Sequence, residues 1–304
     1  NAAIGINQSS GGLMSVERAG DLPIRTALSG PAAGVVGAVH VSKLAGHENV
    51  ITLDMGGTSA DVALIRKGKA GIGFDQKVAE FPVRLPMVDV NTIGAGGGSI
   101  AWFDRDGLLK VGPASAGATP GPACYGLGGT EPTVSDANLI LGRLSSRGLL
   151  DGEMGLDTAL SKAAFERIAT RLEFSIEKTA HGVLGIVCAN MVRAIRAVSV
   201  ERGYDPRGFA LMALGGAGPL HAVDVARTLG MKTVIVPPAP GILCAQGLVV
   251  SDLKEDFVAS ERIRIDDEGI AAIATHIQGL LDRAKAWFSA EKIDEADRWM
   301  ELVF

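Results

Sequence analysis

The chain has few cysteines, few aromatic residues and no strong excess of either charge. Its 304 residues include three cysteines, Cys124, Cys188 and Cys244, which are far apart and lack C-x-x-C spacing. This spacing argues against a cysteine-based zinc site and fits a reduced, cytoplasmic compartment. The net charge of −5 gives no basic footprint for nucleic acid. Because the sequence has no signal peptide and no apolar run of about 18 residues, we expect no interaction with a membrane.

Two common nucleotide-binding patterns are also missing. No G-x-x-x-x-G-K-[ST] segment occurs, which excludes a P-loop. Gly216-Ala217-Gly218 imitates the start of a dinucleotide fingerprint, but His221 stands at the third glycine position. The next apolar run ends in Pro237 instead of an acidic residue for a ribose, so a Rossmann site is not favoured. The same turn still presents helix N–H groups that a ligand can approach.

The most informative segment is Asp54-Met55-Gly56-Gly57-Thr58-Ser59-Ala60-Asp61. It lies between the apolar runs Val50–Leu53 and Val62–Ile65, which predict two buried strands. A Gly-Gly turn exposes backbone N–H groups that can approach an anion closely. An Asp at each end can hold Mg²⁺, directly or through water, or orient an attacking water. The alternative is an ordinary hairpin with solvated aspartates.

Further polar candidates lie beside other glycine-rich stretches. Gly94–Ser99 is either a second anion loop or a flexible hinge. Asp89 and Asp136 are candidates for the chemistry of a polar site, with N-capping as the alternative for Asp136. His221 could be a ligand or a base, but one His on an Ala/Val-rich helix is more often a hydrogen-bonded core residue.

Predicted strands and helices alternate along the chain, and 40 glycines accompany 47% hydrophobic but only 5% aromatic residues. This pattern predicts an α/β protein with a mixed sheet. We expect strands at 50–53, 62–65, 100–103, 108–111, 209–214, 233–236 and 257–265. We expect helices at 32–45, 135–144, 157–172, 176–202, 219–229, 242–250 and 268–288. Residues 112–132 form a long Gly/Pro loop, which is unusual unless it serves a site.

The order of these motifs resembles the actin, sugar-kinase and chaperone ATPase superfamily. There, an Ala/Gly-rich connecting helix like Gly30–Ala38 precedes the second phosphate loop. An adenosine-binding turn like Gly215–Gly218 and a second connecting helix like Gly241–Val250 follow it. More specifically, the chain resembles the hydantoinase A / 5-oxoprolinase family. The segments that carry this resemblance are 28–34, 53–61, 91–100, 120–126, 131–138 and 213–222. The sequence departs from the family at Ser10, where Asn is usual, and in having no earlier Asp-x-Gly-Gly-Thr loop.

The resemblance implies an actin-like ATPase (ribonuclease H-like) lobe with a mixed sheet flanked by helices and a family-specific Gly/Pro-rich insert. Residues 1–49 would be the end of a first lobe and a connecting helix. Residues 50–252 would be the nucleotide-binding lobe with the second connecting helix, and 253–304 the start of a truncated C-terminal region. We therefore expect a piece of a longer protein that is inactive in isolation.

The resemblance also implies an enzyme that uses ATP and Mg²⁺ to hydrolyse a cyclic amide, such as hydantoin or 5-oxoproline, through a phosphorylated substrate. Asp54 would hold the metal and act in catalysis with Asp61, Asp89 and Asp136. The cofactor contacts would come from the two glycine turns, at Gly56, Gly57, Thr58, Ser59, Gly215, Gly216 and Gly218. The implied partner is a hydantoinase B-type large subunit or domain. The resemblance leaves open whether the chain also forms a homo-oligomer. The alternatives are a ketone carboxylase subunit, a small-molecule kinase, and a non-catalytic nucleotide-binding regulator.

Overall fold

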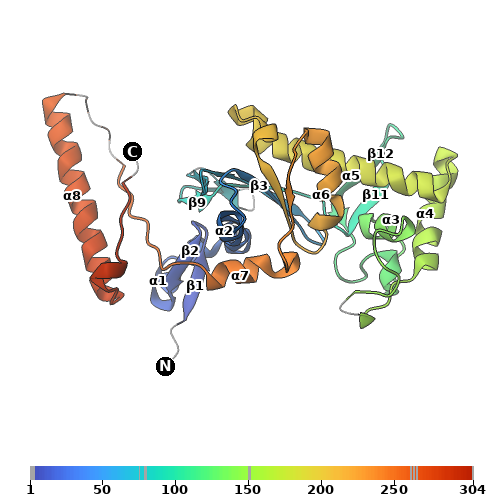
Figure 1. The fold of residues 1–304 in the computed structure, drawn as a ribbon, viewed down its shortest axis with the longest axis horizontal. Coiled ribbons are helices and arrows are strands. Elements are labelled where there is room, and N and C mark those ends of the chain that lie inside the picture. The colour runs from blue at the N-terminus through green and yellow to red at the C-terminus, as the bar shows by residue number, and fades with distance from the viewer. Residues whose placement is uncertain are drawn as a thin grey trace.

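The computed structural model describes residues 4–74, 76–78, 81–149, 152–260, 262, 264 and 266–302, which form a central sheet with helices on its faces and further elements at either end of the molecule (Figure 1). The α-helices are α1 Val16–Asp21, α2 Ser29–Leu44, α3 Val134–Ile140, α4 Thr158–Leu172, α5 Ile176–Val198, α6 Gly218–Leu229, α7 Leu243–Val249 and α8 Asp267–Ala290. The strands are β1 Gly5–Gln8, β2 Gly12–Ser15, β3 Val50–Met55, β4 Ala60–Arg66, β5 Lys69–Ala70, β6 Ile72–Gly73, β7 Gln76–Val78, β8 Phe81–Val83, β9 Met87–Val88, β10 Val90–Ile93, β11 Ser99–Phe103, β12 Leu109–Ser115, β13 Ala210–Leu214 and β14 Val234–Ile235.

The central sheet has the strand order β10-β4-β3-β13-β14, and β5 pairs with β4. Strands β3 and β4 form the expected antiparallel hairpin, whereas β13 runs parallel to both β3 and β14. This mixed sheet confirms the predicted α/β class and agrees with the actin-like ATPase lobe. The register pairs Leu214 with Asp54, so the turn after β13 begins beside the end of β3.

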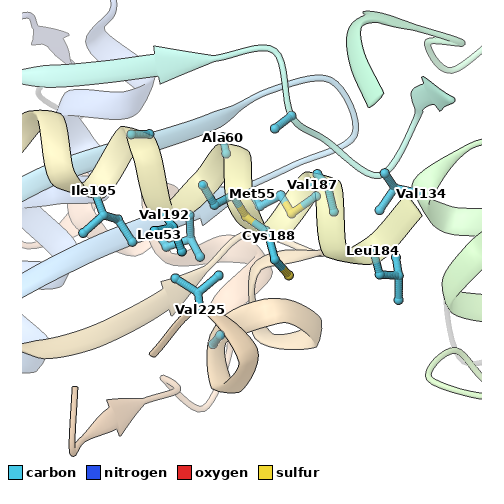
Figure 2. Packing of buried hydrophobic residues seen from close by; sticks show 14 of the residues in the cluster. Leu53, Met55, Ala60, Val134, Leu184, Val187, Cys188, Val192, Ile195 and Val225 are labelled. Atoms are coloured by element: carbon cyan, nitrogen blue, oxygen red, sulfur yellow. The ribbon is translucent and has the colours of Figure 1, made fainter. Parts of the chain in front are cut away.

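Helix α5 covers one face of the sheet and supplies much of the core. Its apolar residues recur at helical spacing, and Figure 2 shows Leu184, Val187, Val192 and Ile195 on the helix that packs over β3. All four side chains are at most 5% exposed. Burying a large aliphatic side chain contributes about 1.5–3 kcal/mol, so this stripe fixes α5 against the central sheet.

Helix α2 covers the opposite face, and α7 crosses α2 in backbone contact. Glycine makes this contact possible, because a Cβ at Gly247 would lie 1.9 Å from the carbonyl oxygen of Ala33. A Cβ at Gly37 would lie 2.8 Å from the carbonyl oxygen of Leu243. The Ala- and Gly-rich composition of the predicted first helix therefore serves helix–helix contact.

The segment after the central hairpin builds a smaller unit beside α5. Strands β11 and β12 correspond to the expected strands at 100–103 and 108–111 and pair antiparallel, and α3 and α4 follow. Helix α3 begins one residue earlier than expected, because Thr133 is its N-cap and forms a capping box with Asp136. Helix α4 begins after the N-cap Asp157, close to the predicted start.

The C-terminal region contains one expected element and lacks another. The predicted helix is present as α8, which stands at one end of the molecule (Figure 1). The predicted strand at 257–265 is wrong for the residues that are described there, which are irregular. The Phe257 ring packs edge-on against Trp287 of α8, with 6.4 Å between ring centroids. Phe257 therefore packs on a helix instead of taking part in strand pairing.

Within the part of the chain that the structure describes, one helical stretch, 176–202, is long and apolar enough to cross a membrane by length and composition alone. Half of its most apolar window is buried within the protein. This is the pattern of a core helix, as the packing of α5 shows.

Candidate functional site

The tip of the β3–β4 hairpin is open to solvent. Gly56, Gly57 and Thr58 are exposed, Ser59 is half-buried, and the Gly56 N–H donates to the Ser59 carbonyl at 3.1 Å. Neither Gly56 nor Gly57 has a positive φ, and among the described residues no atom lies within 4 Å of a Cβ built on either residue. Neither the backbone conformation nor packing within the chain therefore requires glycine here. A ligand that approaches the backbone would require it.

Asp54 and Asp61 lie directly opposite each other on the two strands of the hairpin. Cross-strand partners share one face of a sheet, and this is the face covered by α2. Both side chains are half-buried, and burial is the main cause that raises the pKa of each carboxyl group. A hydrogen bond from the Thr92 hydroxyl to Asp61, at 2.5 Å, opposes that shift, whereas the charge of Asp54 adds to it.

Asp54 is enclosed on the side of α2 and α7. The Cys244 thiol of α7 donates to Asp54 Oδ2 at 3.3 Å, which partly offsets the effect of burial on the Asp54 pKa. Burial, followed by the charge of Asp54, raises the pKa of Cys244 to about 12, so the thiol keeps its proton at neutral pH. A Cβ at Gly34 of α2 would lie 2.9 Å from the Cys244 sulfur. Sequence reasoning missed both Cys244 and Gly34 as neighbours of Asp54.

The second glycine loop, Gly94–Ser99, packs against the tip of the β3–β4 hairpin and supports it. The N–H groups of Gly97 and Gly98 donate to the carbonyl oxygens of Gly56 and Gly57, at 2.9 and 2.6 Å. A Cβ at Gly96 would lie 2.4 Å from the backbone nitrogen of Thr58. These contacts use the N–H groups that an anion loop would need and hold the segment in place. The loop therefore acts as a brace.

The turn after β13 lies directly against the end of β3. The Ala217 N–H donates to the Met55 carbonyl at 2.9 Å. Gly215 has φ +73°, and its Cβ would lie 2.5 Å from Asp54 Oδ1. A Cβ at Gly218 would lie 2.9 Å from the Leu53 carbonyl oxygen. Gly216 is exposed, with no atom within 4 Å of a built Cβ, so its surroundings resemble those of the open hairpin tip.

Asp136 is completely buried and fully engaged by the protein. Its Oδ1 accepts from the Cys124 N–H and the Ser161 hydroxyl, both at 2.8 Å. Its Oδ2 accepts from the Ala123 N–H at 3.3 Å and from the N–H and hydroxyl of Thr133 at 3.0 and 2.7 Å. These five donors tie the Gly/Pro-rich segment to α3 and α4.

Asp89 and His221 lie apart from the hairpin tip. Asp89 precedes β10, three residues before Thr92, and both of its oxygens accept from the Arg202 guanidinium, one of them at 3.2 Å. His221 is fully buried on α6, with Nε2 at 3.3 Å from the Asn138 side-chain nitrogen. His221 is thus a hydrogen-bonded core residue, which is the alternative that the Ala/Val-rich composition of its helix favoured.

The carboxylates at the hairpin fit a magnesium ion whose other ligands are substrate phosphates. Among the described residues, no group of three or more His, Cys, Asp or Glu side chains could hold a metal. Mg²⁺ is commonly bound by one or two carboxylates together with water and substrate phosphates. Asp54 and Asp61 supply two carboxylates beside an open glycine turn, and this combination matches the usual magnesium site.

Comparison with known proteins identifies relatives over most of the chain. Residues 1–257 match the hydantoinase/oxoprolinase family model. The caprolactamase subunit alpha of Pseudomonas jessenii is 44% identical over 262 residues, which cover 86% of this chain and 38% of that subunit. 5-oxoprolinase 1 of Arabidopsis thaliana is 38% identical over 269 residues, which cover 82% of this chain and 21% of that protein.

Solved structures give the same result. The crystal structure of the ATP-dependent caprolactamase from Pseudomonas jessenii has a TM-score of 0.81 at 42% identity, covering 93% of this chain and 41% of that chain. The nucleotide-free structure of acetone carboxylase has a TM-score of 0.75 at 33% identity, covering 82% and 35%. The chain thus spans less than half the length of these relatives. It belongs to the hydantoinase/oxoprolinase family.

Proposed function

We propose that residues 50–252 of this chain are the nucleotide-binding lobe of a cytoplasmic enzyme that uses ATP to open a cyclic amide. The main observation behind this proposal is that three features lie together at the end of β3. These are the open Gly56-Gly57 turn, the paired carboxylates Asp54 and Asp61, and the turn at Gly215. Relatives named as caprolactamase and 5-oxoprolinase support the substrate class of hydantoin or lactam rings.

Each part of the site has a distinct role in this proposal. The open backbone at Gly56 and Gly57 would let phosphates approach, with the Gly57 N–H and the hydroxyls of Thr58 and Ser59 as donors to the β- and γ-phosphates, while the Gly56 N–H closes the turn on the Ser59 carbonyl. Asp54 and Asp61 would hold Mg²⁺ directly or through water. When bound, the ion would neutralise phosphate charge during transfer.

The nucleoside end would lie on the other glycine turn. Gly215 and Gly218 keep this turn against β3, which leaves the open Gly216 facing the adenosine. The five donors on Asp136 and the ion pair of Asp89 support a role for these two residues in positioning the surrounding segments.

The proposed chemistry overcomes the resonance that makes amides resist water. Transfer of the γ-phosphoryl group to the amide oxygen releases ADP and makes the ring carbon electrophilic. Water then adds to that carbon, the ring C–N bond breaks, and a second water hydrolyses the acyl phosphate to carboxylate and phosphate. Because the chain spans only part of its relatives, we propose that turnover requires the rest of such a subunit and a B-type large partner.

A ketone carboxylase subunit is the second candidate, favoured by the similarity to acetone carboxylase. The same phosphoryl transfer would then act on an enolate oxygen. Assays that supply hydantoin, 5-oxoproline, caprolactam, or acetone with bicarbonate to the full-length protein and its partner distinguish these substrates.

The test of the site compares substitutions at the hairpin with a matched control. In the full-length enzyme, Asp54→Ala should abolish ATP-dependent turnover and the Mg²⁺ dependence of ATP binding. Gly57→Val should weaken ATP binding by about tenfold or more, since one blocked phosphate contact corresponds to about 1.4 kcal/mol or more. Gly185→Val is the control, because Gly185 is exposed on α5 with open space around its Cβ. Turnover at the wild-type rate in Asp54→Ala would refute the assignment.

A further inference from the structure

Cys244 contacts the carboxylate that the proposed function places at the metal. It lies at the second position of α7, and its thiol donates to Asp54 Oδ2 at 3.3 Å. The two residues are 190 positions apart in the sequence. The contact therefore depends entirely on how α7 is placed against the sheet.

The packing of α7 leaves this thiol little freedom. Backbone contact between α2 and α7 at Gly37 and Gly247 fixes the helix along its length. On the other side of the thiol, a Cβ at Gly34 would lie 2.9 Å from the sulfur and 3.4 Å from Asp54 Oδ2. The sulfur is thus held between the α2 backbone and the carboxylate.

The two oxygens of Asp54 have different surroundings. Oδ2 is directed to Cys244 and Gly34, whereas Oδ1 lies beside Gly215 of the adenosine-side turn. A donor on Oδ2 therefore selects which oxygen is presented to the nucleotide side. A carboxylate without that donor could turn about its χ2 torsion, which is broad for Asp.

We propose that Cys244 is a positioning residue, whose thiol holds Asp54 Oδ2 so that Oδ1 is presented to the metal and nucleotide. This inference rests on the proposed function. It predicts that the thiol contributes to Mg²⁺ dependence and leaves the metal-free affinity for ATP unchanged. A donor at position 244 is required, and sulfur itself is not.

The test measures how much Mg²⁺ is needed for half-maximal binding of a fluorescent ATP analogue to the full-length protein. Cys244→Ala should raise this concentration about fivefold, which corresponds to the loss of one hydrogen bond of about 1 kcal/mol. Cys244→Ser keeps a donor and should recover most of the wild-type value. Binding of the analogue without Mg²⁺ should be the same in all three proteins.

Asp54→Ala separates failure of this inference from failure of the proposed function. If Asp54→Ala changes the Mg²⁺ requirement but Cys244→Ala does not, the positioning role is overturned and the metal site stands. If neither changes it, the metal assignment itself fails. A Cys244→Ser variant that behaves like Cys244→Ala, or a Cys244→Ala effect confined to the melting temperature, also overturns the positioning role.

Discussion

Asp136 provides the sharpest test of structural against catalytic roles. Asp136→Asn keeps the size of the side chain but replaces one acceptor oxygen with an NH₂ donor. Placed at Oδ1, the NH₂ faces the Cys124 N–H, while the Ser161 hydroxyl can rotate to accept. Placed at Oδ2, it faces the N–H groups of both Ala123 and Thr133. The first orientation is cheaper, but it still leaves a buried backbone N–H without an acceptor.

The expected loss follows from this geometry. An unsatisfied buried donor costs about 1–3 kcal/mol, and the remaining bonds lose their charged acceptor. Lower desolvation of the neutral amide offsets part of that loss, so we expect a net destabilisation of about 2–4 kcal/mol. In a chain of this size, such a change lowers the melting temperature by roughly 4–8 °C.

Thermal unfolding followed by circular dichroism measures this shift, with Asp157→Asn as the matched control. Asp157 is the exposed N-cap of α4, and its Oδ1 accepts from Ala159 and Leu160 N–H groups. Asn caps helices about as well as Asp, so this control should change stability by less than about 0.5 kcal/mol. A wild-type melting temperature for Asp136→Asn combined with lost turnover would refute the structural role and restore the catalytic one.

Two further predictions concern the second glycine turn and the buried histidine. Gly215→Ala should lower the free energy of unfolding by roughly 2–4 kcal/mol, because of its positive φ and a Cβ 2.5 Å from Asp54 Oδ1. Gly216→Ala has open space and should stay within about 0.5 kcal/mol, whereas Gly216→Leu should sharply weaken ATP binding; equal unfolding midpoints in urea for the two alanine variants would contradict this. Burial is the main cause that lowers the pKa of His221 from 6.5 to about 4. Between these values only the unfolded chain binds the proton, so this contribution to stability is full above pH 6.5 and falls by about 2 kcal/mol by pH 5. His221→Gln should remove that part of the pH dependence of the melting temperature, and an unchanged dependence would exclude His221 as its source.

Local sequence signals predicted the elements of the site better than their assembly. The β3–β4 hairpin follows from two apolar runs around Gly56-Gly57, and hairpin pairing alone places Asp54 opposite Asp61. The helix start at the end of Gly215–Gly218 is equally local. That this turn touches Asp54 depends on parallel pairing of β3 with β13, which no local pattern specifies.

The roles of the isolated aspartates could not be read from the sequence for a related reason. Asp89 and Asp136 both stand beside glycine-rich stretches, as a catalytic or a structural carboxylate would. Their roles depend on donors brought from other elements, such as Arg202 for Asp89 and Ser161 for Asp136. No local sequence pattern marked Cys244, because its partner Asp54 lies at the other end of the lobe's sequence.

The glycines around the end of β3 fall into two groups that together outline the site. A Cβ at Gly96, Gly215 or Gly218 would lie 2.9 Å or less from backbone or side-chain atoms, so these glycines let the brace and the second turn approach the hairpin. Gly56, Gly57 and Gly216 have open space and face solvent. The first group holds the second group in a fixed arrangement. Donors that are already oriented need little reorganisation when charge moves during phosphoryl transfer, which is the condition under which electrostatic stabilisation is most effective. Under the proposed function, the constrained glycines would therefore contribute to the chemistry by holding the open turns in place.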